Sequence, residues 1–140
     1  MQYKQIKNKY IIRIDPGEEI VETLKKFCKT HNITAGTITG LGATNNVSIG
    51  LFELKTKTYH SKTFTDDHEI APLYGNITTM NNDIYLHLHI NICDTKHQSY
   101  SGHLNKAVVS ATFEGVIEQI DGTIQREFNE TMKLNLLSLK

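Results

Sequence analysis

Several features are scarce or missing in this sequence of 140 residues, and each absence excludes something. There are only two cysteines, Cys28 and Cys93, and they lie far apart in the chain without CxxC spacing. A structural disulfide is therefore not expected, and a reducing compartment fits. The sequence has two prolines and no low-complexity tract or linker, which indicates one continuous globular unit.

Neither sign of charge is in excess. Lysine and arginine together number 15, and aspartate and glutamate together also number 15, so the formal net charge is zero. A dedicated nucleic-acid-binding domain usually carries a basic excess or a basic stripe, and neither is present here. The composition therefore does not favour strong, non-specific binding to duplex DNA.

Long hydrophobic runs are also missing. No segment approaches the roughly 20 apolar residues that a membrane helix needs. The opening segment, MQYKQIKNKY, has no apolar run of signal-peptide length. We expect a cytoplasmic protein without membrane contact. The hydrophobic content of 39% is enough to bury a core, and the length suits one domain over residues 1–140.

One helix is predicted near the N-terminus, after a short β-branched segment at Tyr10–Ile14. Asp15 is a suitable N-cap, Pro16 would occupy the first helical position, and Glu18 follows the cap by three residues, as in a capping box. Apolar residues at helical spacing then form one stripe, made of Ile20, Val21, Leu24, Phe27 and Cys28. The pattern predicts one long helix over about Glu18–His31.

From Thr34 onward the pattern changes to alternating, β-branched segments separated by turn residues. The glycines of TGLGAT, residues 39–44, suggest bulges or a close approach of backbones, and Pro72 suggests an edge or a bulge in its strand. The sequence therefore predicts an α+β fold, with a mainly antiparallel β-sheet and one long N-terminal helix.

Four of the seven histidines lie within LHLHINICDTKHQSYSGH, residues 86–103. Because side chains alternate between the two faces of a strand, His87 and His89 share one face while an aliphatic series occupies the other. Positions two apart lie roughly 6.5–7 Å from each other, and from there two imidazoles can reach one metal ion. His103 is the obvious third ligand, if a loop around Asp94 brings the chain back beside the histidine strand.

Three imidazoles form an all-nitrogen site, which favours a divalent metal and zinc above the others. At least one coordination position would stay open for water or a small-molecule ligand. The same histidine pair is also compatible with a plain polar strand face, and both interpretations stay open at this point. Of the other histidines, His31 is expected to cap the helix end, His97 to be solvated at a loop tip, and His60 and His68 to lie at the surface.

The order of several short motifs resembles that of the plants-and-prokaryotes-conserved (PPC) domain over about Tyr10–Ile120. The motifs are RIDPGEEI, ITGLGAT, GNIT, LHLHINICD, GHL and ATFEGVIEQI. In plants this domain follows an AT-hook in AT-hook nuclear-localised proteins, and in bacteria and archaea it stands alone. The resemblance implies an α+β domain that assembles as a homotrimer. It also implies that His87, His89 and His103 match the family's histidine pattern, where a metal ion binds near a subunit boundary.

The resemblance singles out three further residues. Asn76 matches the asparagine of the GNI stretch, Glu114 the glutamate after the histidines, and Arg13 the early arginine. Glu114 would act as a general base if it lay within hydrogen-bond reach of a metal-bound water. A structural interpretation is open for each of them, with Asn76 satisfying a turn and Arg13 forming an ion pair with Glu114.

The sequence is compatible with three functions. The first is a small trimeric metal-binding protein with a three-histidine site, whether or not it is an enzyme. The second is a DNA-binding or regulatory module, as the plant proteins suggest, although the chain has no RGRP-like AT-hook core. The third is a cupin-like metalloenzyme, which is disfavoured because the glutamate that usually follows the HxH pair of cupins is absent.

Overall fold

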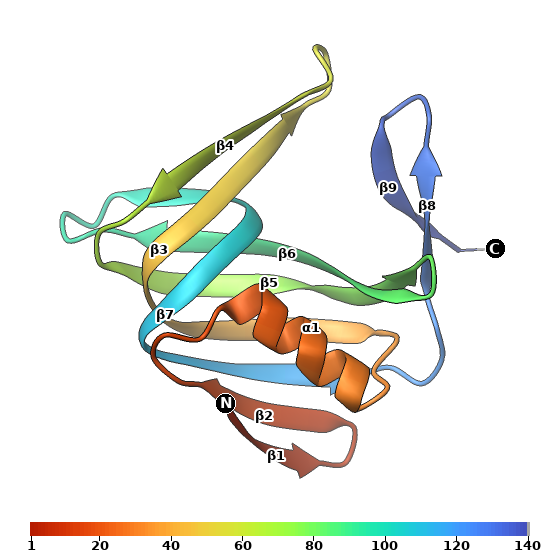
Figure 1. Ribbon diagram of the computed structural model, residues 1–140, viewed down its shortest axis with the longest axis horizontal. Helices are drawn as coiled ribbons and strands as arrows, with labels where there is room; N and C mark the ends of the chain where they lie inside the picture. The colour runs from red at the N-terminus through yellow and green to blue at the C-terminus, as the bar shows by residue number, and fades with distance from the viewer. Residues whose placement is uncertain (140) are drawn as a thin grey trace.

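The computed structural model describes residues 1–139, which form a mainly antiparallel β-structure with one helix (Figure 1). The elements in chain order are β1 (Gln2–Ile6), β2 (Lys9–Ile14), α1 (Ile20–Thr30), β3 (Gly36–Glu53), β4 (Thr58–Phe64), β5 (His68–Met80), β6 (Asp83–Cys93), β7 (Ser99–Gln119), β8 (Gln125–Asn129) and β9 (Leu134–Ser138). Among the strand pairs formed by these residues, only the short contact of β5 with β8 is parallel. The predicted mainly antiparallel sheet with a single helix is therefore confirmed.

Four strands close into a ring, because β3 and β6 each pair with both β5 and β7. The long strands β3 and β7 also carry the outer strands, since β4 pairs with β3 and the hairpin of β1 and β2 pairs with β7. The β8–β9 hairpin stands at one end of this arrangement and is joined to it through β5 (Figure 1). The histidine strand β6 thus lies between two strands rather than at a free edge.

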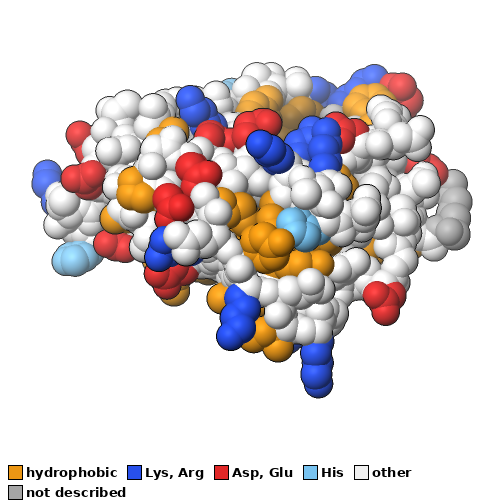
Figure 2. All heavy atoms as spheres, turned by 60° about the horizontal axis from the view of Figure 1, so that its bottom comes forward, with side chains coloured by type: hydrophobic (Ala, Val, Ile, Leu, Met, Phe, Trp, Pro, Cys, Tyr) orange, Lys and Arg blue, Asp and Glu red, His pale blue; other side chains and the backbone are white. Residues whose placement is uncertain are grey.

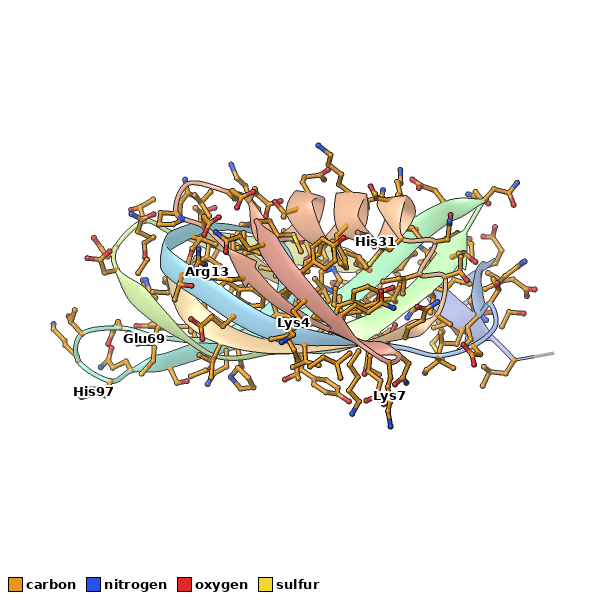
Figure 3. The ribbon with its side chains drawn as sticks, turned by 90° about the horizontal axis from the view of Figure 1, so that it is seen from below. Lys4, Lys7, Arg13, His31, Glu69 and His97 are labelled. Carbon is orange, nitrogen blue, oxygen red and sulfur yellow. The ribbon has the colours of Figure 1, made fainter. Side chains whose placement is uncertain are left out.

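The hydrophobic core joins the helix to the inner faces of the strands. α1 packs against β6 and β7, on one side of the sheet (Figure 3). Its Leu24 is fully buried, as are Ile92 of β6 and Phe113 of β7, and all three belong to one cluster. Burying such side chains is the main favourable contribution to folding, at about 25 cal/mol per Å² of apolar surface. The opposite side of the sheet is free of helices within the described residues (Figure 3).

The helix is shorter than the sequence predicted. It has 11 residues, Ile20–Thr30, and not the long span Glu18–His31. The backbone just before it pairs with β7 instead, because the Gly17 N–H donates to the Val109 carbonyl and the Val109 N–H donates to the Glu18 carbonyl. Gly17 also has a φ of +85°, which is not helical. Tertiary hydrogen bonds to a neighbouring strand therefore replace the first predicted turn.

The helix N-cap is Glu19 rather than Asp15. The Glu19 carboxylate accepts hydrogen bonds from the N–H groups of Val21 and Glu22, and a third from Ala107 of β7. The predicted contact of Glu18 with the Asp15 N–H does form, at 2.9 Å, but it closes a turn ahead of the helix. The Glu19 side chain therefore both caps the helix and connects its first turn to β7.

Two predicted irregularities are present in the strands. The pairing of β3 with β5 shifts between Gly40 and Gly42, and the pairing of β5 with β6 shifts between Ile70 and Leu73, around Pro72. A side chain at Gly40 is excluded, because a Cβ there would lie 2.4 Å from the Phe113 ring. The glycines of TGLGAT therefore allow the bulge and the packing of a core aromatic beside it.

The remaining histidines take up different environments. His31 is the C-cap of α1 and stacks on Phe27 at 4.0 Å between ring centroids. Hydrophobic side chains gather around a histidine on the side where β1, β2 and α1 meet (Figure 2). The predicted surface position of His68 is wrong, because it is 5% exposed. Its Nδ1 lies 2.6 Å from the carbonyl of Asp66, which satisfies the buried ring.

Within residues 1–139, no helix is long and apolar enough to cross a membrane.

Candidate metal centre

The turn between β6 and β7 returns the chain beside the histidine strand. The Asp94 N–H donates to the Gln98 carbonyl, and the Asp94 carboxylate accepts from the N–H groups of Lys96 and Gln98. This aspartate pattern fixes a tight turn, and the two strands that leave it are antiparallel. His97 is exposed at the tip, as predicted, and its side chain lies far from His31 and the helix (Figure 3).

The antiparallel pairing brings the three predicted histidines together. His89 and His103 are direct partners across β6 and β7, and His87 lies two residues before His89, on the same face of β6. One ring nitrogen from each residue lies within 4.8 Å of the other two. The ring centroids are 5.2 to 5.7 Å apart. The prediction that these three side chains converge is confirmed.

These nitrogens fit the dimensions of a metal site. Two nitrogens that each bind zinc at about 2.0–2.1 Å lie at most about 4.2 Å apart, so small ring rotations close the present spacing. The donor set is chemically uniform, since it consists of three imidazoles and contains no acidic ligand among the described residues. Neutral imidazole is a ligand for zinc, copper, iron and nickel, and the group can hold one such ion.

The electrostatics of the group keep its histidines in the form that binds metals. The pKa of His87 is lowered from its ordinary 6.5 to about 4, mainly by burial and then by the charges of Arg126, His103 and His89, in that order. The pKa of His103 is also lowered, first by burial and then by His89 and Arg126. Both rings are therefore neutral near pH 7, and a metal does not have to displace a proton from them.

Arg126 of β8 is the residue of this site that the sequence analysis missed. Its side chain is only 7% exposed. The guanidinium donates to Thr78 Oγ1 at 2.9 Å and to the Asn135 carbonyl at 2.8 Å. It also lies 4.9 Å from the centroid of the Tyr85 ring, as in a cation–π contact. One guanidinium thus holds together the ends of four strands.

The same guanidinium connects Asn76 to the histidines. Its Nη2 donates to Asn76 Oδ1 at 2.8 Å and lies 3.4 Å from His87 Nδ1. Asn76 and His87 are direct partners across β5 and β6, which explains why one nitrogen reaches both. Burial lowers the pKa of Arg126 below its ordinary value, but a guanidinium keeps its charge at neutral pH. Asn76 therefore belongs to the surroundings of the histidine group and not to a turn.

The structure does not bring the other two predicted residues into the histidine group. Glu114 is exposed in a distant part of β7, opposite Arg13 of β2 and Leu41 of β3. Arg13 and Glu114 are neighbours across the strands, but the ion pair that forms joins Arg13 to Asp15 at 3.1 Å. A general-base role for Glu114 stays a prediction without support from the geometry of a single chain.

Tyr59 of β4 flanks the group next to His103, whereas Arg126 lies next to His87. Its ring centroid lies 6.4 Å from that of His103, in an edge-on arrangement. The Tyr59 hydroxyl donates to Asn105 Oδ1 at 2.6 Å, which fixes the ring next to the histidine. The candidate centre therefore has an aromatic ring beside His103 and a buried cation beside His87.

The fold is a partly closed antiparallel β-structure with one helix. Its three histidines lie on neighbouring strands, so the protein is a small β-domain with a candidate metal centre. The chain belongs to the Plants and Prokaryotes Conserved (PCC) domain family, whose model matches residues 1–121. This confirms the resemblance found in the sequence motifs. No protein of curated function matches the chain.

Solved structures with the same fold come from bacteria and archaea. A candidate DNA-binding protein from Bacteroides thetaiotaomicron is 40% identical, with a TM-score of 0.96, over 98% of this chain and 96% of the other. A metal-containing protein from Archaeoglobus fulgidus is 26% identical, with a TM-score of 0.86, over 99% of both chains. A plant- and prokaryote-conserved protein from Pyrococcus horikoshii, 24% identical over 99% of this chain and 95% of the other with a TM-score of 0.85, supports the fold alone.

Proposed function

We propose that the chain is a metal-binding protein in which His87, His89 and His103 hold one divalent ion, zinc above the others, with at least one position left open. The observation that carries the proposal is the convergence of three ring nitrogens within 4.8 Å. The similar protein from Archaeoglobus fulgidus contains a metal by its name, which supports the same conclusion. The neutral state of His87 and His103 supports it as well.

An ion held by three neutral imidazoles with an open position lowers the pKa of a bound water or polarises a bound carbonyl group. The chain itself contributes the orientation of the rings, through the β6–β7 pairing, and the two walls formed by Tyr59 and Arg126. This arrangement suits a small-molecule ligand better than a purely structural ion, because one of the three histidines, His89, is exposed.

The direct test is metal analysis of protein purified without an affinity tag. We expect one divalent ion per chain, either as purified or after zinc is added and the excess is removed. A chain that carries no stoichiometric metal in both cases contradicts the proposal, and the histidine strand is then only a polar face.

We also propose that the chain assembles as a homotrimer. Exposed apolar side chains outside the core support assembly, since Leu41 and Tyr74 are each 60% exposed and Ile11 is 44% exposed. Burying such a surface between copies would remove it from water. Light scattering at micromolar concentration should give three times the chain mass of 15.9 kDa, and a monomer mass contradicts the proposal.

DNA binding is a second candidate function, favoured by the description of the 40% identical protein from Bacteroides thetaiotaomicron. The formal net charge of zero supports only weak contact with phosphates, although a cation such as Lys7 extends from the β1–β2 turn on the side away from α1 (Figure 3). Titration with duplex DNA at low and at high salt decides the question. Binding with a clear salt dependence supports this function, and the lack of such binding removes it.

A further inference from the structure

Arg126 places an unbalanced positive charge beside the histidine group. Buried charges are normally paired with an opposite charge, because burial without a partner is costly. The guanidinium is 7% exposed, yet the groups that accept its hydrogen bonds are the neutral oxygens of Thr78, Asn135 and Asn76. None of the ion pairs formed within residues 1–139 includes Arg126. Within the part of the chain that the structure describes, this charge therefore has no counter-ion.

Metal binding at His87 would also remove a hydrogen-bond acceptor from Arg126, in addition to its missing counter-ion. Nη2 of Arg126 faces Nδ1 of His87 at 3.4 Å, and an N–H can donate there only while Nδ1 has a free lone pair. If Nδ1 holds the metal, its lone pair is used. If Nε2 holds the metal, Nδ1 carries the proton. In both cases an N–H group of Arg126, directed at the edge of the metal centre, loses its acceptor.

The metal centre itself offers no negative charge either. Its three ligands are neutral imidazoles, and no acidic residue belongs to the group among the described residues. A divalent ion in this place would keep its full charge a few ångströms from a guanidinium. The electrostatically favourable ligand for the open position is therefore an anion.

We propose that the open position takes an oxyanion, namely a carboxylate or phosphate group of a small molecule, which binds the metal and accepts a hydrogen bond from Arg126. Guanidinium groups match both kinds of oxyanion in shape and charge. The inference rests on the proposed metal-binding function and specifies its ligand class. Arg126 is then the residue that selects an anionic ligand over a neutral one, and Asn76 positions its guanidinium through the 2.8 Å hydrogen bond.

The test uses the full chain loaded with cobalt(II), whose visible absorption reports changes in its ligands. Cobalt accepts the same imidazole ligands as zinc. Acetate and inorganic phosphate are titrated separately, and we expect at least one of them to change the spectrum in a saturable way. The anion that changes the spectrum at the lower concentration, acetate or phosphate, identifies the kind of oxyanion that the site prefers.

The decisive variant is Asn76→Asp, which keeps Arg126 and the shape of the site but supplies the missing counter-ion. We expect its anion affinity to fall about tenfold or more, the effect of removing one strong charged hydrogen bond, while cobalt still binds. Arg126→Gln should show the same loss, and Arg126→Lys should recover part of it. Asn91→Asp is the matched control, because it adds the same charge on β6 but contacts Ser99 and Ala71 rather than Arg126.

The outcomes separate the two proposals. A chain that takes up no cobalt contradicts the metal-binding function, and this inference with it. A cobalt-loaded chain that responds to neither anion overturns the inference alone. Equal anion affinities for the parent and Asn76→Asp overturn it as well, as does an equal loss in Asn76→Asp and Asn91→Asp. If Arg126→Gln does not fold, the Asn76→Asp comparison still decides.

Discussion

The backbones of Gly102 in β7 and Gly50 in β3 approach so closely that a Cβ on Gly102 would lie 2.7 Å from the Gly50 carbonyl oxygen. His103, the next residue, is the direct partner of Gly50 across these strands. Gly102 lies inside β7 and not in the turn that precedes it. Its role is to admit a neighbouring strand, and the position of His103 depends on it.

We expect Gly102→Ala to reduce both stability and metal affinity. The added methyl group must push β3 and β7 apart, and overpacking of this kind costs about 1–3 kcal/mol. Urea unfolding and zinc titration measure the two effects. Ser101→Ala is the control, because Ser101 is exposed and its change should leave both values unchanged. Equal behaviour of the two variants would mean that the close approach is not needed.

We expect His89→Ala to remove most of the zinc affinity while the chain stays folded. His89 is exposed and outside the core, so its loss opens no cavity. Loss of a direct ligand should cost at least the ~10–100-fold that follows loss of an outer-shell partner. His97→Asn serves as the control, because His97 lies at the turn tip with a φ of +61°, which asparagine tolerates. Unchanged affinity in His89→Ala would disprove the ligand assignment.

The stability of the metal-free protein should fall as the pH falls from about 6.5 toward 4. His87 has a pKa of about 4 when folded, below its ordinary 6.5. Within this interval the unfolded chain binds a proton that the folded chain does not, so acid favours unfolding. Above pH 6.5 this contribution is constant. Urea unfolding at pH 7.5 and at pH 5 measures the effect.

His87→Gln is the comparison for the pH experiment. It should show a smaller loss of stability between pH 7.5 and pH 5 than the parent does, because it removes the group whose pKa is lowered. An equal loss in both proteins would assign the pH dependence to other groups. Asp83 does not interfere, since its pKa is held near 2 by Lys29 and Lys25 and it titrates only at more acidic pH.

We expect Glu19→Ala to be more destabilising than the loss of an ordinary helix cap. Removing an N-cap side chain typically costs about 0.5–2 kcal/mol, and here the Ala107 N–H of β7 also loses its acceptor. Glu22→Ala is the control, since it changes an exposed residue of the same helical turn. Thermal or urea unfolding compares the variants. A cost no greater than that of Glu22→Ala would contradict the double role of Glu19.

The histidine group could be predicted from the sequence because its geometry depends on local features, namely the alternation of side chains along a strand and a short turn. His87 and His89 fall on one face by simple alternation, and the Asp94 turn returns the chain within a few residues to place His103 opposite His89. The bulges near Gly42 and Pro72 were predicted for the same reason, as properties of local backbone chemistry.

The remaining features depend on contacts between distant segments. Asp15 and Glu18 form the local contact of a capping box, but hydrogen bonds from Gly17 and Glu18 to Val109 of β7 delay the helix. Arg126 reaches Asn76 across fifty positions of sequence. Its only signal in the sequence was that it is one of two arginines in the chain, within a short strand-like segment.

The family model ends at residue 121, whereas Arg126 belongs to the hairpin of β8 and β9 that follows. The three histidines therefore lie within the part of the chain that the family model matches, and the cation beside them lies beyond it. A change confined to the hairpin would therefore alter the residue that we propose selects the ligand, while the three imidazoles on β6 and β7 stay as they are.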